Sequence, residues 1–279
     1  MGDLGAELAR YAAAAEAAVG EAHGIFVSHV GAAPALAKGR GDFATQADLQ
    51  IEALLRERLA ESTGINVYGE EHGGRLNPEA CWVVDPIDGT SNYSSGNPNC
   101  AILVSLILEG QPVVAVTDIP LLGMRVTAEA GGPLRLNGEA LPPLDASNQP
   151  AAAQVGVGSV GSMGSVDRQQ FPAHVRLALI GQLAETGLRP RISGSVGVDL
   201  AFAALGIYRA AVSFSPHVWD NAAGVLLARS AGAAVSDAAG SHWQLGSVGV
   251  IAGAPAAHRS VADTMNRVQR DSTGGARWQ

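Results

Sequence analysis

Four acidic residues, Glu70, Asp85, Asp88 and Asp220, are the residues of this chain whose type and position could do chemistry. Each lies where a strand is expected to end or a helix to begin, and none has an obvious basic partner nearby in the sequence. Clustered carboxylates raise one another's pKa and destabilise a fold unless divalent cations lie between them. Because oxygen-only ligands select hard cations, the expected ion is Mg²⁺, with Mn²⁺ as the alternative.

Two of these acids follow an apolar run, residues 81–84, that predicts a short buried strand. The strand would place Asp85 at its carboxyl end, and the proline that follows should end it because proline has no N–H to donate. The chain then turns at Asp88-Gly89, and a helix could begin at Thr90. The two acids could face one cation while backbone N–H groups after Gly89 face an oxyanion. The alternative is that Asp-Gly only forms a turn.

Other acids also have both a chemical and a structural interpretation. Glu70 is followed by Glu71, and adjacent like charges beside glycines need solvent or a cation. Asp220 lies in the first turn of an expected helix, where the helix dipole favours a carboxylate in any case. Thr45 and Asp48 fit a capping box, and the sequence alone favours this structural role over catalysis.

The composition limits the class of protein. With 47% hydrophobic and 16% charged residues, the 279-residue chain is expected to be compact and globular. Its net charge of −8 argues against a nucleic-acid partner and would repel a phosphorylated substrate unless cations lay between them. No apolar run is long enough to span a membrane, and no secretory signal is recognised. The two cysteines lie in apolar runs, which favours reduced core thiols and a cytoplasmic location.

The periodicity of apolar residues predicts helices and strands in two halves, 1–148 and 149–279. The first half should contain two helices on a largely antiparallel sheet, with a loop at 34–41 and a polar, proline-rich boundary at 141–149. Its helices are expected from Asp3 and from Thr45, and its strands at 65–68, 81–84, 101–108, 113–119, 124–128 and 134–136.

The second half is predicted to have strands at 153–157, 208–214, 233–235 and 248–252, a helix near 168–183, and a last helix at 256–268. Two further helices should begin at the small residues 193–197 and near Pro216, and the tail from Asp271 should be disordered. Residues 156–161 match the dinucleotide pattern G-x-G-x-x-G, but no helix is expected to open there, so this interpretation is disfavoured. Motifs for zinc proteases, P-loops, serine hydrolases and EF-hands are absent from the sequence.

Three motifs resemble those of the inositol monophosphatase family of Mg²⁺-dependent, Li⁺-sensitive phosphatases. They are Gly69-Glu70-Glu71, the stretch Trp82-Val-Val-Asp85-Pro-Ile-Asp88-Gly-Thr90-Ser-Asn92, and Trp219-Asp220-Asn-Ala-Ala-Gly224. Their order and spacing cover nearly the whole chain. The resemblance implies an αβαβα layered sandwich, in the α+β or α/β class, and a homodimer.

The resemblance also implies roles for individual residues. Glu70, Asp85 and the carbonyl of Ile87 would hold a first metal ion; Asp85, Asp88 and Asp220 would hold a second; and Glu70 would face a third. The backbone N–H groups of Gly89 and Thr90 would receive the phosphate. Asp48 would pair with Thr90 to orient and deprotonate the attacking water, which reverses the preference for a cap, although both roles can coexist. Gly194, Ser195 and Val196 match a substrate-facing stretch of the family.

One position departs from the inositol-specific members. Seven residues before Asp220, where those members have an acid that binds sugar hydroxyls, this chain has Ser213, which cannot clamp a vicinal diol as a carboxylate does. The sequence thus predicts hydrolysis of a small phosphorylated polyol or sugar, with inositol monophosphate as the first candidate. Fructose 1,6-bisphosphate, histidinol phosphate and 3′-phosphoadenosine nucleotides are the alternatives. A regulatory binding protein on the same fold is a further alternative, and Lys38 is assigned no role.

Overall fold

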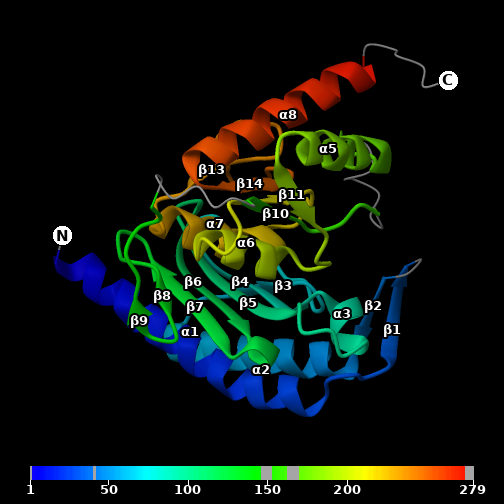
Figure 1. Ribbon diagram of the computed structural model, residues 1–279. Helices are drawn as coiled ribbons and strands as arrows, with labels where there is room; N and C mark the ends of the chain where they lie inside the picture. Colours follow the sequence, from blue (N-terminus) through cyan, green and yellow to red (C-terminus); the bar gives the residue numbers. More distant parts are fainter. Residues whose placement is uncertain (1, 40–41, 146–152, 162–169, 274–279) are drawn as a thin grey trace.

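A computed structural model describes residues 2–39, 42–145, 153–161 and 170–273. Figure 1 shows helices and sheets stacked in five layers, which confirms the predicted αβαβα sandwich. The outer helices on one side are α1 (Gly2–Ser28) and α2 (Gln46–Thr63), and on the other side α5 (Ala173–Glu185) and α8 (Pro255–Thr273). The middle layer is formed by α6 (Val196–Ala204) and α7 (Val218–Ser230). None of the helices in these segments combines the length and apolar character that a bilayer crossing requires.

The first sheet has seven strands in chain order, because most of its connections are tight turns between antiparallel neighbours. It consists of β3 (Val67–Gly69), β4 (Ala80–Asp88), β5 (Ala101–Leu108), β6 (Gln111–Ile119), β7 (Met124–Glu129), β8 (Arg135–Leu136) and β9 (Glu139–Ala140). The short 3₁₀ turn η1 (Pro120–Leu122) joins β6 to β7. Only β3 runs parallel to its neighbour, β4, so that both strands end at the same edge of the sheet.

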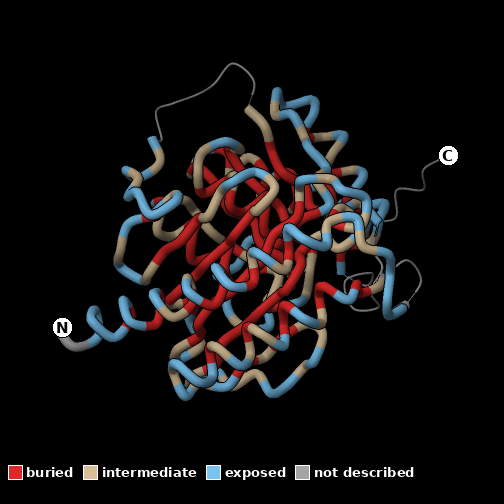
Figure 2. The backbone as a smooth tube through the Cα atoms, turned by 90° about the horizontal axis from the view of Figure 1, so that it is seen from below, coloured by how far each residue is buried: buried red, intermediate tan, exposed pale blue. Residues whose placement is uncertain are grey.

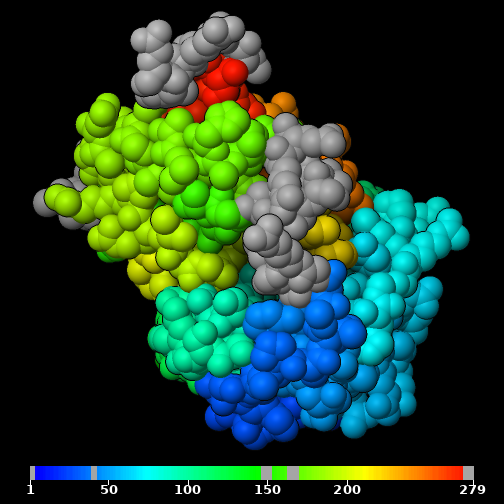
Figure 3. Space-filling model, turned by 90° about the vertical axis from the view of Figure 1, so that its right-hand side faces the viewer, coloured from blue at the N-terminus to red at the C-terminus, as the bar shows by residue number. Residues whose placement is uncertain are grey.

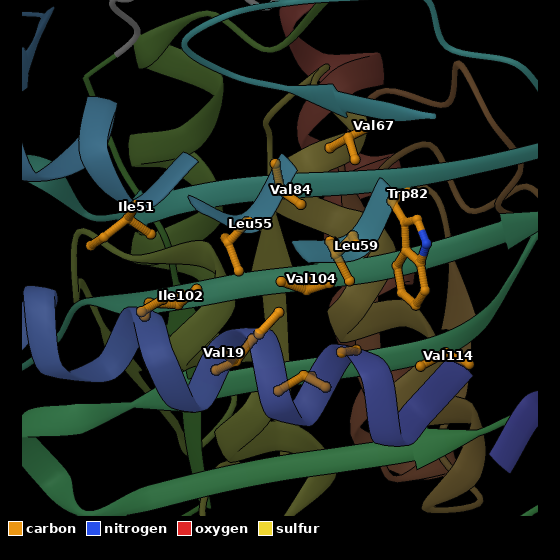
Figure 4. Close-up of a cluster of buried hydrophobic side chains, with 14 of the residues drawn as sticks. Val19, Ile51, Leu55, Leu59, Val67, Trp82, Val84, Ile102, Val104 and Val114 are labelled. Atoms are coloured by element: carbon orange, nitrogen blue, oxygen red, sulfur yellow. The ribbon is translucent and has the colours of Figure 1, made fainter. Parts of the chain in front are cut away.

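The first two helices cover one face of this sheet. Val19 of α1 and Ile51, Leu55 and Leu59 of α2 are fully buried against strand residues such as Val104, as Figure 4 shows. The spacing of these α2 residues places them on one face of the helix. The helix ends at Gly64, whose positive φ of 73° allows the backbone N–H to bind the Ala60 carbonyl. This packing fixes the location of the buried carboxylates of α2, Asp48 and Glu52.

The second sheet has the order β11-β10-β12-β14-β13. Its strands are β10 (Ala153–Val157), β11 (Leu188–Arg191), β12 (Ala210–Ser213), β13 (Ala234–Ser236) and β14 (Val250–Gly253), and β10 is parallel to both of its neighbours. The tube in Figure 2 shows the buried residues concentrated in the interior, with exposed residues around them. In the middle layer, Gly224 of α7 lies so close to Leu200 of α6 that a Cβ atom would overlap it. Glycine in the third motif is therefore required by helix packing.

Several local expectations were wrong. The predicted loop at 34–41 contains β1 (Pro34–Gly39), which pairs with β2 (Asp42–Thr45) as an antiparallel hairpin. The proline after Asp85 does not end β4, because the strand continues to Asp88 across a register shift in its pairing with β5. The last helix continues past Asp271 to Thr273. The helix expected from residue 168 begins at Ala173, and residues 162–169 lie outside the described part of the chain.

Other expectations hold or stay predictions. No helix opens at the described residues 158–161, but residues 162–169 lie outside the described ranges, so the rejection of the dinucleotide motif stays a prediction. Cys81 and Cys100 are free and buried. The expected boundary at 141–149 falls between the two sheets, with residues 146–152 outside the described ranges, and the division into two halves stays a prediction.

Candidate active site

The turn that follows Asp85 is built mostly from buried polar groups. Asp85 is 2% exposed, and its Oδ1 accepts a hydrogen bond from the Ile87 N–H at 3.0 Å. Gly89 has a φ of 84°, and a Cβ there would lie 3.0 Å from the Asn99 carbonyl oxygen, so this turn requires glycine. The short helix α3 (Thr90–Ser94) begins next, and the Thr90 hydroxyl donates to the Ile87 carbonyl at 3.0 Å. The predicted turn and helix start are confirmed.

Asp88 connects this turn to the first turn of α6. Its Oδ2 accepts hydrogen bonds from the Ser195 hydroxyl and from the Gly197 N–H at 2.6 Å, and its Oδ1 accepts from the Val196 N–H at 3.2 Å. Burial raises the pKa of Asp88 to about 6, while these three donors act in the opposite direction. The substrate-facing prediction for Ser195 and Val196 thus coincides with a structural role, in which their donors hold a predicted metal ligand.

Glu70 has a basic partner that is distant in the sequence. The Lys38 ammonium on the β1–β2 hairpin lies 2.7 Å from Glu70 Oε1 and 2.5 Å from Glu71 Oε1. Burial lowers the pKa of Lys38, but the attraction of Glu70 and Glu71 outweighs it and the net pKa is raised. Burial raises the pKa of Glu71 to about 7. Figure 3 shows the face on which the N-terminal blue segments adjoin the cyan segment that follows α2.

The pKa values of Asp85 and Asp220 are both raised, by burial first and then by the charges of the other acids. The pKa of Asp85 lies well above its ordinary value because of burial, followed by the charges of Glu70, Asp88 and Asp220. The pKa of Asp220 is raised by burial and by Asp88 and Glu70, and it is lowered in part by hydrogen bonding with Ser215 and Asp85. The fold therefore brings the four acids together, although the first, Glu70, and the last, Asp220, are 150 residues apart in the sequence.

The chemistry of this group fits a divalent cation, because its donors are hard oxygens and because burial, together with the charges of neighbouring acids, raises the pKa of Asp85, Asp88 and Asp220. The side-chain positions do not form a ready cage, however: no group of three or more His, Cys, Asp or Glu side chains within the described ranges is placed to hold a metal ion. Two predicted ligands are engaged elsewhere, Glu70 by Lys38 and Asp88 by the start of α6. The assignment of Glu70, Asp85, Ile87, Asp88 and Asp220 as metal ligands stays a prediction.

Asp48 takes part in both of the interactions that the sequence left as alternatives. Its Oδ2 accepts from the Thr45 N–H at 2.7 Å and from the Thr45 hydroxyl at 2.5 Å, which completes the capping box of α2. Its Oδ1 lies 3.4 Å from the Thr90 hydroxyl. Burial is the largest cause of its raised pKa. The cap is confirmed, and the catalytic pairing with Thr90 stays a prediction with the two groups in reach.

The remaining predicted substrate contacts differ in accessibility. Gly194 is exposed, has a φ of 81° and donates its N–H to the Gly158 carbonyl at 3.0 Å. Ser213 is only 1% exposed, and its hydroxyl accepts from the Ser215 N–H at 3.1 Å within the turn after β12. Both stay predictions as substrate contacts. Ser213 differs from a diol-binding carboxylate in its burial and in its hydrogen bond within the turn, as well as in its residue type.

Three buried or bridging residues near the site were assigned no role from the sequence. Asn92 donates from Nδ2 to the Asn99 carbonyl at 2.6 Å and to the Ser193 carbonyl at 2.8 Å, which ties α3 to the loop before α6. Glu52 is fully buried on α2, one turn after Asp48, but that i, i+4 spacing is shared by many exposed helical pairs and did not indicate its burial. Asp199 is also buried, in the first turn of α6.

Replacing Asp199 with Asn is expected to stabilise the protein above neutral pH. By hydrogen-bond geometry neither Asp199 carboxylate oxygen has a partner among the described residues, since the nearby Ser193 hydroxyl donates to the Ser195 carbonyl. Burial raises the pKa of Asp199 to about 8, with Ser193 lowering it only in part. A raised pKa means that the wild type loses stability as the pH rises from near 4 towards 8, whereas an amide has no charge to bury. The unfolding free energy of Asp199→Asn at pH 8 should exceed that of the wild type by ~2 kcal/mol in urea titrations. Equal stabilities at pH 8 with a difference at pH 4 would contradict this.

Comparison with known proteins identifies the class to which this arrangement of acids and layers belongs. The sequence profile of the Inositol monophosphatase family matches residues 5–271, so the chain belongs to that family. It is 44% identical over 84% of its length, and 86% of the relative's, to a protein of Mycobacterium tuberculosis named probable inositol 1-monophosphatase ImpA. Together these matches define the chain as a phosphoric monoester hydrolase.

Two further relatives extend the comparison. The chain is 30% identical, over 78% of its length and 80% of the relative's, to an Escherichia coli K12 protein named Nus factor SuhB. Among solved structures, an inositol monophosphatase from Anabaena (Nostoc) sp. PCC 7120 has a TM-score of 0.75 at 23% identity, covering 95% of this chain and 97% of that one. At that identity the structural match supports the fold alone.

Proposed function

We propose that this enzyme hydrolyses a small phosphorylated polyol or sugar in a Mg²⁺-dependent reaction, with inositol monophosphate as the first candidate substrate. The observation that carries the proposal is the buried Asp85, whose pKa is raised by burial and by the charges of Glu70, Asp88 and Asp220, in a chain of this family. The name of the 44% identical mycobacterial relative supports the choice of substrate. Buried carboxylates that raise one another's pKa have a use if they bind and neutralise cations.

The residues of the chain then have distinct tasks. Two or three bound Mg²⁺ ions would lower the pKa of a water molecule and stabilise the leaving alkoxide of an in-line displacement. Glu70, Asp85, Asp88, Asp220 and the Ile87 carbonyl would supply oxygen ligands. Asp48 would accept a proton through the Thr90 hydroxyl, which lies 3.4 Å away. The backbone N–H groups of Gly89 and Thr90 at the start of α3 would orient the phosphate. No covalent intermediate is required.

A substrate panel tests the proposal. With Mg²⁺ present, the rate of phosphate release is expected to be higher from inositol monophosphate than from sugar, nucleotide and histidinol phosphates. Chelation of the metal should abolish this release, and Li⁺ should inhibit it. The colorimetric measurement uses the wild type, with Asp85→Asn as the inactive control. Faster release from fructose 1,6-bisphosphate, histidinol phosphate or a 3′-phosphoadenosine nucleotide would identify that compound as the better substrate. The comparison is needed because Ser213 stands where inositol-specific members have an acid. Release that is unaffected by chelation would contradict the metal assignment.

A regulatory binding role is the second candidate, favoured by the identity with the relative named Nus factor SuhB. It is distinguished by comparing the wild type with the Asp85→Asn variant in cells that lack the gene. An equal biological effect of both proteins would favour the binding role, and loss of effect in the variant would favour catalysis.

We also propose that the enzyme is a cytoplasmic homodimer. The homodimer follows from the family resemblance, and the free buried thiols Cys81 and Cys100 favour a reducing compartment. Sedimentation analysis and cell fractionation measure the two properties directly.

A further inference from the structure

A fully buried carboxylate on α2 binds the backbone of the loop that carries Glu70. Glu52 is 0% exposed, and its Oε2 accepts from the Glu71 N–H at 2.6 Å while its Oε1 accepts from the His72 N–H at 3.0 Å. Gly69 lies so close that a Cβ there would overlap the Glu52 carboxylate. The carboxylate thus occupies the inside of the turn immediately around Glu70.

Arg56, one helical turn after Glu52, completes this arrangement. Its Nε donates to Glu52 Oε1 at 2.8 Å, and its two terminal nitrogens donate to the Val67 carbonyl at 3.0 Å and to the Gly73 carbonyl. The guanidinium therefore binds carbonyls on either side of the loop, while the carboxylate binds amides in its middle. Planar, multiple-donor contacts of this kind fix geometry as well as charge.

The cost of burying Glu52 indicates that the charge has a purpose. A buried ion pair is rarely more stabilising than apolar residues of the same volume, since both charges lose their hydration. Here both oxygens of the carboxylate are used on consecutive amides, which a hydrophobic side chain could not bind. The same helix face carries Asp48 at position i−4, so that α2 is connected both to Thr90 and to the Glu70 loop.

We propose that Glu52, supported by Arg56, is a positioning residue that holds residues 69–73 so that Glu70 can bind a cation. This inference rests on the proposed Mg²⁺-dependent function, and it concerns a residue outside the predicted ligand set. Groups that orient metal ligands typically change metal affinity by ~10–100-fold when removed. Glu52 would act on the ligand through the backbone of the neighbouring residues.

The test replaces Glu52 with Gln, which has one acceptor oxygen and therefore cannot bind both amides. Calorimetric titration with Mg²⁺ alone should show the dissociation constant raised ~10-fold or more. Hydrogen exchange at the amides of residues 71 and 72 should be faster, and saturating Mg²⁺ should restore most of kcat. The matched control is Glu57→Gln, the same substitution on the same helix at a side chain 60% exposed, which should leave all three unchanged.

Two results separate positioning from mere stability. A lower melting temperature with wild-type Mg²⁺ affinity and wild-type exchange at residues 71 and 72 would overturn the proposal. If Glu52→Gln does not fold, Arg56→Lys serves instead, because lysine keeps the charge but loses the multiple-donor contact. This variant should also raise the Mg²⁺ dissociation constant, and an unchanged constant would overturn the proposal. If the wild type itself neither binds Mg²⁺ nor releases phosphate, the proposed function fails. If the wild type is active and binds Mg²⁺ but hydrogen exchange at residues 71 and 72 is unchanged in the variant, only the role of Glu52 is refuted.

Discussion

Replacing Asp85 with Asn is expected to lower kcat/KM for phosphate release by at least ~10³-fold and, at the same time, to raise the melting temperature of the metal-free protein. Asp85 is the one side chain predicted to bind both the first and the second metal ion. Its loss should therefore remove charge stabilisation at the reacting phosphate. Its pKa is raised by burial and by Glu70, Asp88 and Asp220. In the wild type, stability is therefore lost as the pH rises above the ordinary Asp value, and an amide avoids that loss.

The two effects are measured by phosphate release and by thermal unfolding at pH 7.5 with and without Mg²⁺. Mg²⁺ should raise the melting temperature of the wild type, because a ligand that binds only the folded state stabilises it, and should have little effect on the variant. Asp263→Asn, at an exposed position on α8, is the matched control and should behave as the wild type. Residual turnover above a tenth of the wild-type rate would remove Asp85 from the metal site.

Replacing Asp48 with Asn is expected to lower kcat by ~10²–10⁴-fold, the usual contribution of general acid–base catalysis. Asp48 is fully buried and within reach of the Thr90 hydroxyl, and Asn cannot accept the proton. The variant should also weaken the capping box of α2, an effect of ~1 kcal/mol, but the amide avoids burying the charge of Asp48, whose pKa is raised, so that the stability loss should be smaller than that of Thr45→Ala. Steady-state kinetics at saturating Mg²⁺ and urea unfolding measure the two losses separately.

Two neighbouring substitutions distinguish the cap from the catalytic role. Thr45→Ala removes the capping hydroxyl and should lower stability more than turnover, whereas Thr90→Ala should lower turnover with a smaller effect on stability. An Asp48→Asn variant that loses stability but keeps its kcat would show that the carboxylate is only a cap.

Several predictions that depended on periodicity and spacing agree with the structure. The apolar residues of α2 and the run before Asp85 specify which faces are buried, and the capping pair Thr45 and Asp48 marks the helix start within one residue. Gly89 and Gly224 are required by a turn and by helix packing, respectively, which is why these glycines belong to the motifs. Such features are local, or repeat along one element, and can be inferred from a single sequence.

Contacts between distant segments could not be predicted in this way. Lys38 reaches Glu70 because residues 34–45 form a hairpin, which their polar and mixed composition does not indicate. Asp88 binds amides more than 100 residues later in the chain, and nothing in either segment specifies that partner. Glu52 has the same spacing from Asp48 as many exposed helical pairs, so its burial only becomes evident once the Gly69 turn packs against it. Tertiary placement, rather than residue type, distinguishes these roles.

The bonds between Asp88 and α6 also bear on how this fold can be recombined. Asp88 comes from the segment before the predicted boundary, and its three donors come from the segment after it. A chimera that joined the first segment of this chain to the second segment of a relative would have to preserve the backbone path of residues 195–197. Otherwise a buried carboxylate would lose its donors and α6 would lose its acceptor in the same event. The two segments are therefore expected to be exchangeable only as a matched pair, even where each retains its own core.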